Sequence, residues 1–413
     1  MVAVGGAHHI EGGGKILRGV LRFRQWQIAA FLIYLGLADR DFEAFSWKSI
    51  RWGPIMRSDL FIGMMSGTSA DGIDVAALRT DGIAITELGP ATTFAMRAEL
   101  RCAIRRASGN AIAPRELIEA VTAEHVLAAK TFLSMHSIST SDVRAVGLHG
   151  QTILHRPSEG ISVQIGDAVK LAAAISVDVV DQFRIQDVEA GGQGAPIAPI
   201  FHAALMRDGP LPSAIVNIGG IANVTWFDGT RIVAYDAGLG NARLDDWMRD
   251  RAGLDFDEDG KHAVKGKVHE TILETALAHE YYSRMPPKSL DRDELSVSNI
   301  DRLSVEDGAA TLAAISAEAI VRSQQFLPRQ PERWIVVGGG RRNPAIMRRL
   351  RMKLGNVVDA EAVGLDGDAV EAHLIAYLTA RKLAELPSTF PQTTGVVSPV
   401  VCGILNLAAK KAL

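Results

Sequence analysis

The sequence has few cysteines and no apolar run long enough for a membrane span, and both absences restrict what it can encode. Cys102 and Cys402 are the two cysteines among 413 residues, and they match no metal-binding or redox spacing. A disulfide framework is therefore excluded, a reducing compartment is the default, and both side chains are expected to be buried. An apolar run at residues 28–38 is shorter than the about 20 residues that cross a bilayer.

The chain also lacks a strong charge of either sign. Its formal net charge is −3 and it has no basic stripe, which argues against a nucleic-acid surface. The sequence does have 47% hydrophobic residues over a length of 413, enough to bury a large core in more than one domain.

The first 57 residues differ from the rest of the chain. They contain a glycine-rich start, a basic patch and the short apolar run, followed by Gly36-Leu-Ala38, a pattern that resembles a secretory signal. Met56 stands just before an apolar strand, so we favour a mis-assigned start codon over a genuine extension. In either case, residues 1–57 are not expected to be part of the fold.

The most informative stretch is 61–74, where an apolar strand meets a turn rich in glycine and hydroxyl groups and a second strand leaves it. Glycine lets a backbone approach a ligand closely, hydroxyls donate hydrogen bonds, and carboxylates can hold a cation. These are the components of a phosphate cradle, although serine, glycine and aspartate also form ordinary turns. The residues predicted to bind nucleotide here are Gly67, Thr68, Ser69, Ala70, Asp71, Gly72, Ile73 and Asp74.

Similar glycine turns recur twice. Residues 214–227 again predict strand, glycine turn and strand, and 334–344 predict a buried strand, a glycine turn and a helix opened by Asn343 and Pro344. The two hairpins suggest a duplicated architecture, and all three turns fit a nucleotide site split between two α/β domains. The added candidates are Gly219, Gly220, Asn223, Gly338, Gly339 and Gly340.

With these stretches in view, the chain resembles the anhydro-N-acetylmuramic acid kinases, within the superfamily of sugar kinases, hexokinase and actin. The likeness runs from about Met56 to the C-terminus. It rests on ordered motifs that include Met65-Ser-Gly-Thr-Ser-Ala-Asp-Gly-Ile-Asp74, Gly147-Leu-His-Gly-Gln-Thr-Ile153, Gly191-Gly-Gln-Gly-Ala-Pro196, Asn217-Ile-Gly-Gly-Ile-Ala-Asn-Val-Thr225, Gly338-Gly-Gly-Arg-Arg-Asn-Pro344 and Asp366-Gly-Asp-Ala-Val-Glu-Ala372.

The resemblance implies a fold and a reaction. The fold is α/β, with two related actin-like domains and an ATP cleft between them: residues 58–190 completed by helices in 366–413, and residues 191–365. The reaction consumes ATP and water, opens 1,6-anhydro-N-acetylmuramic acid and phosphorylates O6, giving N-acetylmuramic acid 6-phosphate in peptidoglycan recycling. ATP and Mg²⁺ as cofactors, a cytoplasmic location and a homodimer are the accompanying expectations, with the metal ligands left open.

The resemblance also assigns roles to individual residues. The first two glycine turns face each other around the phosphates, and Gly338–Gly340 border the adenine and ribose. His149 and Gln151, expected just after a strand over 143–148, contact the sugar or shape its pocket. For His149 the alternative is a structural histidine that its neighbours hold in place. The remaining substrate-binding candidates are Arg184, Asp187, Asp236, Asn241 and Glu371; an exposed helix face is an equally good interpretation of Glu371.

The catalytic base is where the chain departs from the pattern. The family has Asp-Phe-Arg followed two residues later by Asp, whereas this chain has Asp181-Gln-Phe-Arg-Ile-Gln-Asp187, so that Gln182 stands at the base position. An amide cannot accept a proton from water near neutral pH. Asp181, one residue earlier, is the replacement candidate if the loop rearranges; in a strand, it would point to the opposite face.

Three hypotheses remain open: a working kinase in which Asp181 or another carboxylate is the base, a degenerate member that binds ATP or the anhydro sugar as a sensor, and a kinase for a different sugar. The last residues, 405–413, are expected to form a frayed helical tail.

Overall fold

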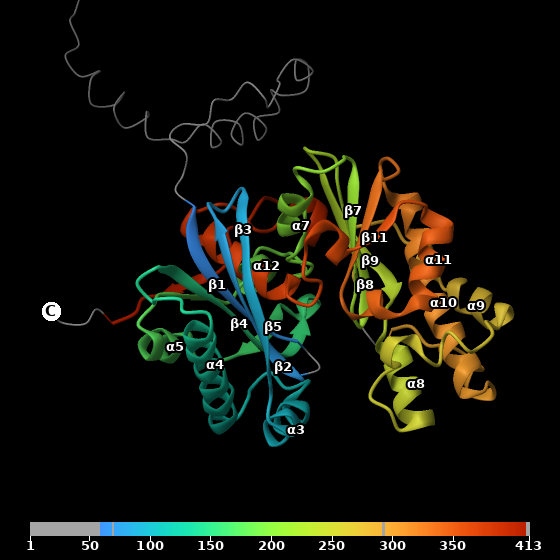
Figure 1. Ribbon diagram of the computed structural model, residues 1–413, viewed down its shortest axis with the longest axis horizontal. Helices are drawn as coiled ribbons and strands as arrows, with labels where there is room; N and C mark the ends of the chain where they lie inside the picture. Colours follow the sequence, from blue (N-terminus) through green and yellow to red (C-terminus); the bar gives the residue numbers. More distant parts are fainter. Residues whose placement is uncertain (1–57, 68–69, 291–293, 410–413) are drawn as a thin grey trace, which may run out of the picture. The chain divides into compact units, whose positions relative to one another are not determined.

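The computed structural model describes residues 58–67, 70–290 and 294–409, so the predictions for residues 1–57 and for Thr68 and Ser69 lie outside the described residues. Two β-sheets organise the described chain (Figure 1). The first has the order β12-β6-β4-β1-β2-β3, with β5 paired to β4; the second has the order β11-β10-β7-β8-β9. The strands of the first sheet are β1 (Asp59–Ser66), β2 (Gly72–Thr80), β3 (Ile85–Ala95), β4 (Val143–Arg156), β5 (Ile161–Ile165), β6 (Val179–Asp181) and β12 (Ile404–Asn406). Those of the second are β7 (Ser213–Ile218), β8 (Ile221–Phe227), β9 (Ile232–Leu239), β10 (Arg333–Val337) and β11 (Val357–Asp359).

The two sheets repeat one topology. In each, an antiparallel meander of three strands is extended by two strands that run parallel to the first: β1-β2-β3 by β4 and β6, and β7-β8-β9 by β10 and β11. The two predicted glycine hairpins are β1–β2 and β7–β8, at equivalent places in the repeat. The α/β class and the duplicated architecture predicted from the sequence are therefore confirmed.

Helices cover both faces of each sheet. The outer face of the first sheet packs against α3 (Ala98–Ala107), α4 (Arg115–Met135) and α5 (Ala168–Ile175). The outer face of the second packs against α8 (Ala242–Ala252), α9 (Glu270–Leu277), α10 (Val305–Ser323) and α11 (Pro344–Leu354). Asn343 caps α11 by accepting the Ala345 N–H at 3.0 Å, as the sequence predicted.

A third core lies between the two sheets and is filled by two helices that exchange sides. After β6 the chain forms α6 (Ile185–Glu189) and α7 (Pro199–Met206), and α7 packs on β7, β8 and β9 of the second sheet. After β11 it forms α12 (Val370–Leu383), which packs on β1, β2 and β4 of the first. The approach of α12 is close, since a Cβ at Gly63 would lie 1.9 Å from the Ala372 carbonyl oxygen. The short α13 (Pro391–Thr394) follows.

Two sequence predictions are wrong. Cys102 is exposed, because α3 buries Leu100 and Ile104 and turns the intervening side chain outward; Cys402 is buried as expected. The described part of the tail is not helical, because Ile404–Asn406 form β12, which pairs antiparallel with β6.

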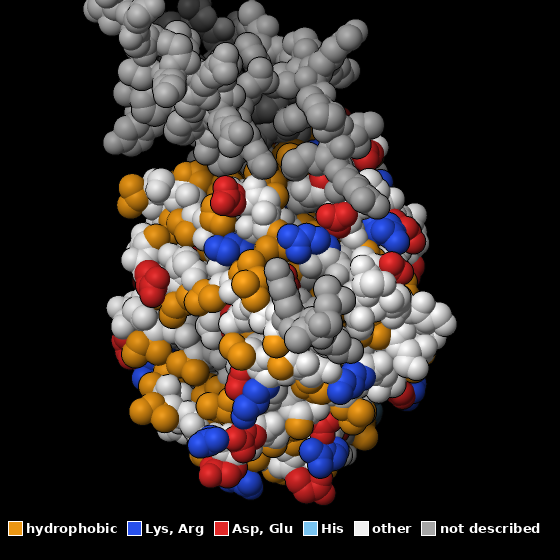
Figure 2. All heavy atoms as spheres, turned by 90° about the vertical axis from the view of Figure 1, so that its left-hand side faces the viewer, with side chains coloured by type: hydrophobic (Ala, Val, Ile, Leu, Met, Phe, Trp, Pro, Cys, Tyr) orange, Lys and Arg blue, Asp and Glu red, His pale blue; other side chains and the backbone are white. Residues whose placement is uncertain are grey.

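The surface agrees with the balanced composition. On the face drawn in Figure 2, basic and acidic side chains are interspersed among apolar ones. None of the helices in the described ranges combines the length and apolar character needed to cross a bilayer.

Candidate active site

The site lies where the two chain crossovers meet the glycine hairpins. The loop after β6 carries Arg184, and the first turn of α12 carries Glu371. The charge of Arg184 acts on Glu371, and the Asn217 side chain at the end of β7 hydrogen-bonds to it. Residues from both sheets are thus brought together by the exchange of α7 and α12.

Arg184 is held in a fixed orientation. Its Nε donates to His149 Nε2 at 3.0 Å, and its Nη1 donates to the Gly194 carbonyl oxygen at 2.8 Å. His149 can accept this bond because its Nδ1 donates to the Gly150 carbonyl oxygen at 3.0 Å. Burial and the nearby Arg184 charge lower the pKa of His149 to about 3, so the imidazole is neutral; burial lowers the pKa of Arg184 to about 10, which leaves it charged at neutral pH.

His149 and Gln151 lie inside a strand and not after it. β4 continues to Arg156 because its second half pairs with β5, with Gln151 opposite Ile165, so the predicted strand end at residue 148 is wrong. Gln151 is buried, and its Nε2 donates to the Gly67 carbonyl oxygen at 3.0 Å. In this position it supports the first glycine turn.

Two acidic residues, Asp74 and Glu371, lie near enough in the candidate site for the charge of one to act on the other. Asp74 stands near the start of β2 and accepts the Thr93 hydroxyl at 2.6 Å. Burial raises the pKa of Asp74, with a further contribution from Asp368 and Asp366, and burial together with the Asp74 charge raises the pKa of Glu371. Glu371 is therefore half-buried, and it does not lie on an exposed helix face.

The second hairpin presents a row of polar groups. Asn217, Asn223 and Asp236 are directly opposed on β7, β8 and β9, which places them side by side on one face. Asp236 accepts the Leu290 N–H at 2.9 Å, and burial raises its pKa to about 6. The Asn241 N–H donates to the Gly219 carbonyl oxygen at 2.7 Å and thereby closes the turn.

The third glycine turn is fixed to the segment that precedes α12. Arg341 donates to the Gly338 carbonyl oxygen at 3.1 Å and pairs with Asp368 at 2.8 Å and Glu361 at 2.7 Å. A Cβ on Gly340 would lie 3.2 Å from Asn241 Nδ2, so this turn lies beside the second one.

Asp187 and Asp181 are engaged by other parts of the chain. Asp187 is fully buried, and its two oxygens accept the Gly194 N–H and the Thr394 hydroxyl, each at 2.6 Å. Asp181 Oδ1 accepts from Asn406 Nδ2 at 3.0 Å. Gln182 adopts φ = 56°, the left-handed conformation, directly after β6.

Three contributors escaped the sequence analysis: Asn217, Arg341 and Asn406. Asn217 and Arg341 fall inside the quoted glycine stretches and could have been singled out there as polar residues beside a turn. Asn406 had no signal, because its contact depends on the pairing of β12 with β6.

A cluster of metal-ligating side chains was looked for among the described residues. In the part of the chain that the structure describes, no three histidine, cysteine or acidic side chains are grouped closely enough to hold a metal ion. The metal ligands therefore stay unassigned.

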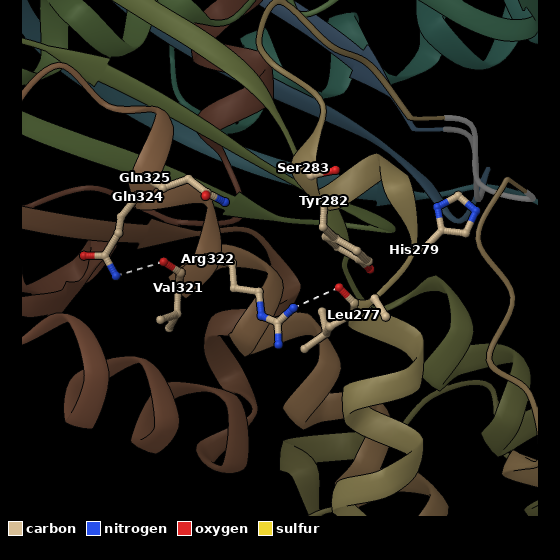
Figure 3. A pocket seen from close by; sticks show the side chains of 9 residues that line it. Leu277, His279, Tyr282, Ser283, Val321, Arg322, Gln324 and Gln325 are labelled. Atoms are coloured by element: carbon tan, nitrogen blue, oxygen red, sulfur yellow. Dashed lines mark hydrogen bonds between the residues drawn. The ribbon is translucent and has the colours of Figure 1, made fainter.

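A separate surface cavity lies at the C-terminal end of α10 (Figure 3). Its polar groups are already paired in part: Arg322 donates to the Leu277 carbonyl oxygen at 2.8 Å, and Gln324 donates to the Val321 carbonyl oxygen at 2.9 Å. None of the predicted site residues lines it.

Two sheets share the same order of five strands, are joined by exchanged helices and carry glycine turns beside acidic groups. These features define the class of two-domain α/β proteins to which the actin-like sugar kinases belong. Residues 59–408 match the family model described as anhydro-N-acetylmuramic acid kinase. The chain therefore belongs to the anhydro-N-acetylmuramic acid kinase family.

Curated relatives with the same family name match this chain over most of their length. A protein of Rhodospirillum rubrum is 46% identical over 83% of this chain and 92% of its own, and one of Rhodopseudomonas palustris is 46% identical over 83% and 98%. A Zymomonas mobilis protein is 42% identical over 84% and 99%.

Solved structures match more distantly. The activator of the 2-hydroxyisocaproyl-CoA dehydratase from Clostridium difficile has a TM-score of 0.40 at 13% identity, covering 79% of this chain and 97% of its own. A ROK family glucokinase from Streptomyces griseus has a TM-score of 0.38 at 14% identity, covering 77% and 97%. Both likenesses are too distant to bear on the function of this chain.

Proposed function

We propose that this protein is an ATP-dependent phosphotransferase that opens 1,6-anhydro-N-acetylmuramic acid with water and phosphorylates O6 of the sugar. The observation that carries the proposal is the match of residues 59–408 to a kinase family named for that substrate. N-acetylmuramic acid 6-phosphate and ADP are the products, within peptidoglycan recycling in the cytoplasm. A homodimer stays a prediction.

The proposed reaction combines two events in one active site. Water adds to the anomeric carbon while the C1–O6 bond breaks, and the electron pair left on O6 forms the new bond to the γ-phosphorus, with ADP leaving. Because the two reactants and the water must be aligned at once, the groups around them need to be fixed before binding.

The residues of this chain supply such fixed groups. Backbone N–H groups of the Gly67 and Gly219–Gly220 turns are suited to the β- and γ-phosphates, and the Gly338–Gly340 turn to the nucleoside. Arg184, locked by His149 and Gly194, offers an oriented positive charge to the sugar or to the developing charge on phosphate. Domain limits at 58–190, 191–365 and 366–413 fit this division of roles.

The test is turnover in ¹⁸O-labelled water. The purified protein, ATP, Mg²⁺ and the anhydro sugar should give a 6-phosphate product with one labelled oxygen at C1, detected by mass spectrometry. N-acetylglucosamine, which has no anhydro bridge to open, is the control acceptor. Phosphorylation of that control with none of the anhydro sugar would instead identify a kinase for another sugar.

A second candidate function is supported by one residue. Gln182 cannot act as a base, so a protein that binds ATP or the anhydro sugar without turnover, as a sensor, is the alternative. Calorimetric binding of both ligands without any labelled product would select it.

A further inference from the structure

Opening the anhydro bridge with water requires a group that accepts the water's proton, and Gln182 is no such group. The carboxylates near Arg184 are the candidates within the described chain. Their existing contacts differ enough to separate them, and the following inference rests on the proposed function.

Asp181 is directed toward the sheet edge and not toward Arg184. It lies opposite Ile404 in the β6–β12 pair, and its Oδ1 is taken by Asn406, whose Nδ2 also lies 3.3 Å from the Val179 carbonyl oxygen. The pKa of Asp181 is raised by burial, and the nearby charge of Asp167 adds to this effect. The shift of the carboxylate by one residue has therefore given it a partner on the C-terminal strand.

Asp187 is closed off from water. Both of its oxygens accept short hydrogen bonds, from Gly194 and Thr394, and the side chain is fully buried. A Cβ on Gly192 would lie 2.2 Å from its Oδ1. Asp187 therefore fixes the loop that orients Arg184, and it remains a structural anchor during the reaction.

Glu371 is placed differently. It stands at the second residue of α12, is half-buried, and meets the Asn217 side chain from the second sheet and the Arg184 charge from the first crossover. Arg184 carries no carboxylate within ion-pair distance among the described residues, so its charge is available to keep Glu371 ionised when substrate excludes solvent. Burial and Asp74 raise the Glu371 pKa, the direction that makes a carboxylate a better proton acceptor near neutral pH.

We propose that Glu371 is the base that activates the attacking water, in place of Gln182 or Asp181. A Glu371 oxygen takes one proton from water as the water oxygen bonds to C1. The C1–O6 bond breaks with its electron pair on O6, O6 bonds to the γ-phosphorus, and the bond to the ADP oxygen breaks. The proton on Glu371 then passes to solvent, which balances the reaction.

The experiment compares Glu371→Gln with Asp181→Asn in the ¹⁸O assay. Because general base catalysis contributes about 10²- to 10⁴-fold, Glu371→Gln should lower kcat by at least about 100-fold. The Kd for ATP, measured by calorimetry, and the urea midpoint should stay near the wild-type values. Asp181→Asn, the matched amide substitution, should keep kcat within about threefold.

Chemical rescue separates a base from a structural role. In Glu371→Ala the missing carboxylate leaves space, and added formate should raise kcat at least tenfold in proportion to its concentration. Formate should have no effect on the wild type.

Each failure has its own signature. An inactive wild type overturns the proposed function and, with it, any assignment of a base. If the wild type is active, two results overturn the Glu371 assignment alone. One is a Glu371→Gln variant with a near wild-type kcat, and the other is an Asp181→Asn variant whose kcat falls by about 100-fold or more. Activity lost in Glu371→Ala and not restored by formate, although ATP binding is intact, also overturns it.

Discussion

The two glycine hairpins occupy equivalent places in the repeated sheets, yet they are stabilised differently. In β1–β2 the Gly67 carbonyl oxygen accepts the Ala70 N–H of its own turn and also a side chain from another strand, Gln151 Nε2, each at 3.0 Å. In β7–β8 the backbone itself closes the turn, with the Gly240 N–H donating to the Gly220 carbonyl oxygen at 3.0 Å and the Asn241 N–H to that of Gly219.

The two hairpins also differ in the charge of the side chains that they contribute. The first hairpin brings in Asp74, whereas the second contributes the amides of Asn217 and Asn223 beside the largely buried Asp236. One topology can therefore serve two tasks: a charged side at the first hairpin, with Asp74, and a side at the second hairpin that is lined mainly by amides. Substitutions that break one side should leave the other intact.

The largest expected effect comes from Gly240→Ala. Its Cβ would lie 2.3 Å from the Gly219 carbonyl oxygen and 3.0 Å from that of Gly220, so the turn must shift. We expect a loss of about 2–3 kcal/mol in the free energy of unfolding, measured by urea denaturation, together with weaker ATP binding.

Gly219→Ala is the matched control for that substitution. Nothing lies nearer than 3.7 Å to its Cβ, so stability should change by no more than about 0.5 kcal/mol. ATP affinity should still fall, because the methyl group occupies space that the proposed phosphates need. Equal stability losses in the two variants would contradict the backbone-closed turn.

The sequence was a good guide wherever a local pattern decides the structure. An apolar strand, a glycine turn and a second strand are adjacent in the chain, so both hairpins and the capped start of α11 were predicted correctly. Those turns positioned most nucleotide candidates. Which turns would lie beside one another was implied by family resemblance and could not be worked out from spacing alone.

Contacts between distant segments were the source of the errors. Three residues, Ile404–Asn406, become a strand because β6 offers an edge, and no local signal distinguishes them from a tail. The same pairing fixes the direction of the Asp181 side chain, which the sequence alone left open. β4 continues through His149 because β5 pairs with it, again a tertiary decision.

The second expected effect concerns Asp236 and pH. Its folded-state pKa, about 6, is above the ordinary aspartate value of 3.8 because burial disfavours the charge. Between pH 4 and 6 the folded protein therefore binds more protons than the unfolded chain, and stability falls as pH rises through this window. Asp236→Asn removes this dependence.

The size of this effect follows from the shift. We expect the wild type to lose about 2 kcal/mol relative to Asp236→Asn between pH 4 and pH 7, measured by urea denaturation at each pH. Parallel curves for the two proteins would show that Asp236 is ionised without cost, as it would be if solvent reached it freely.

The smallest effect is expected on the charged side of the comparison, at Asp71. This residue is exposed, and its ion pair with Arg101 spans 3.4 Å in solvent, so Asp71→Asn should change the free energy of unfolding by at most about 0.5 kcal/mol.

Asp74→Asn, three residues on, is the informative contrast. Its charge is disfavoured by burial and by Asp368 and Asp366, so neutralising it should increase stability at pH 7 while lowering phosphate transfer. Urea midpoints and kcat for the two variants test this: a stabilised, active Asp74→Asn protein would mean that its charge contributes nothing to the reaction, and the functional difference between the two hairpins would then lie in the backbone alone.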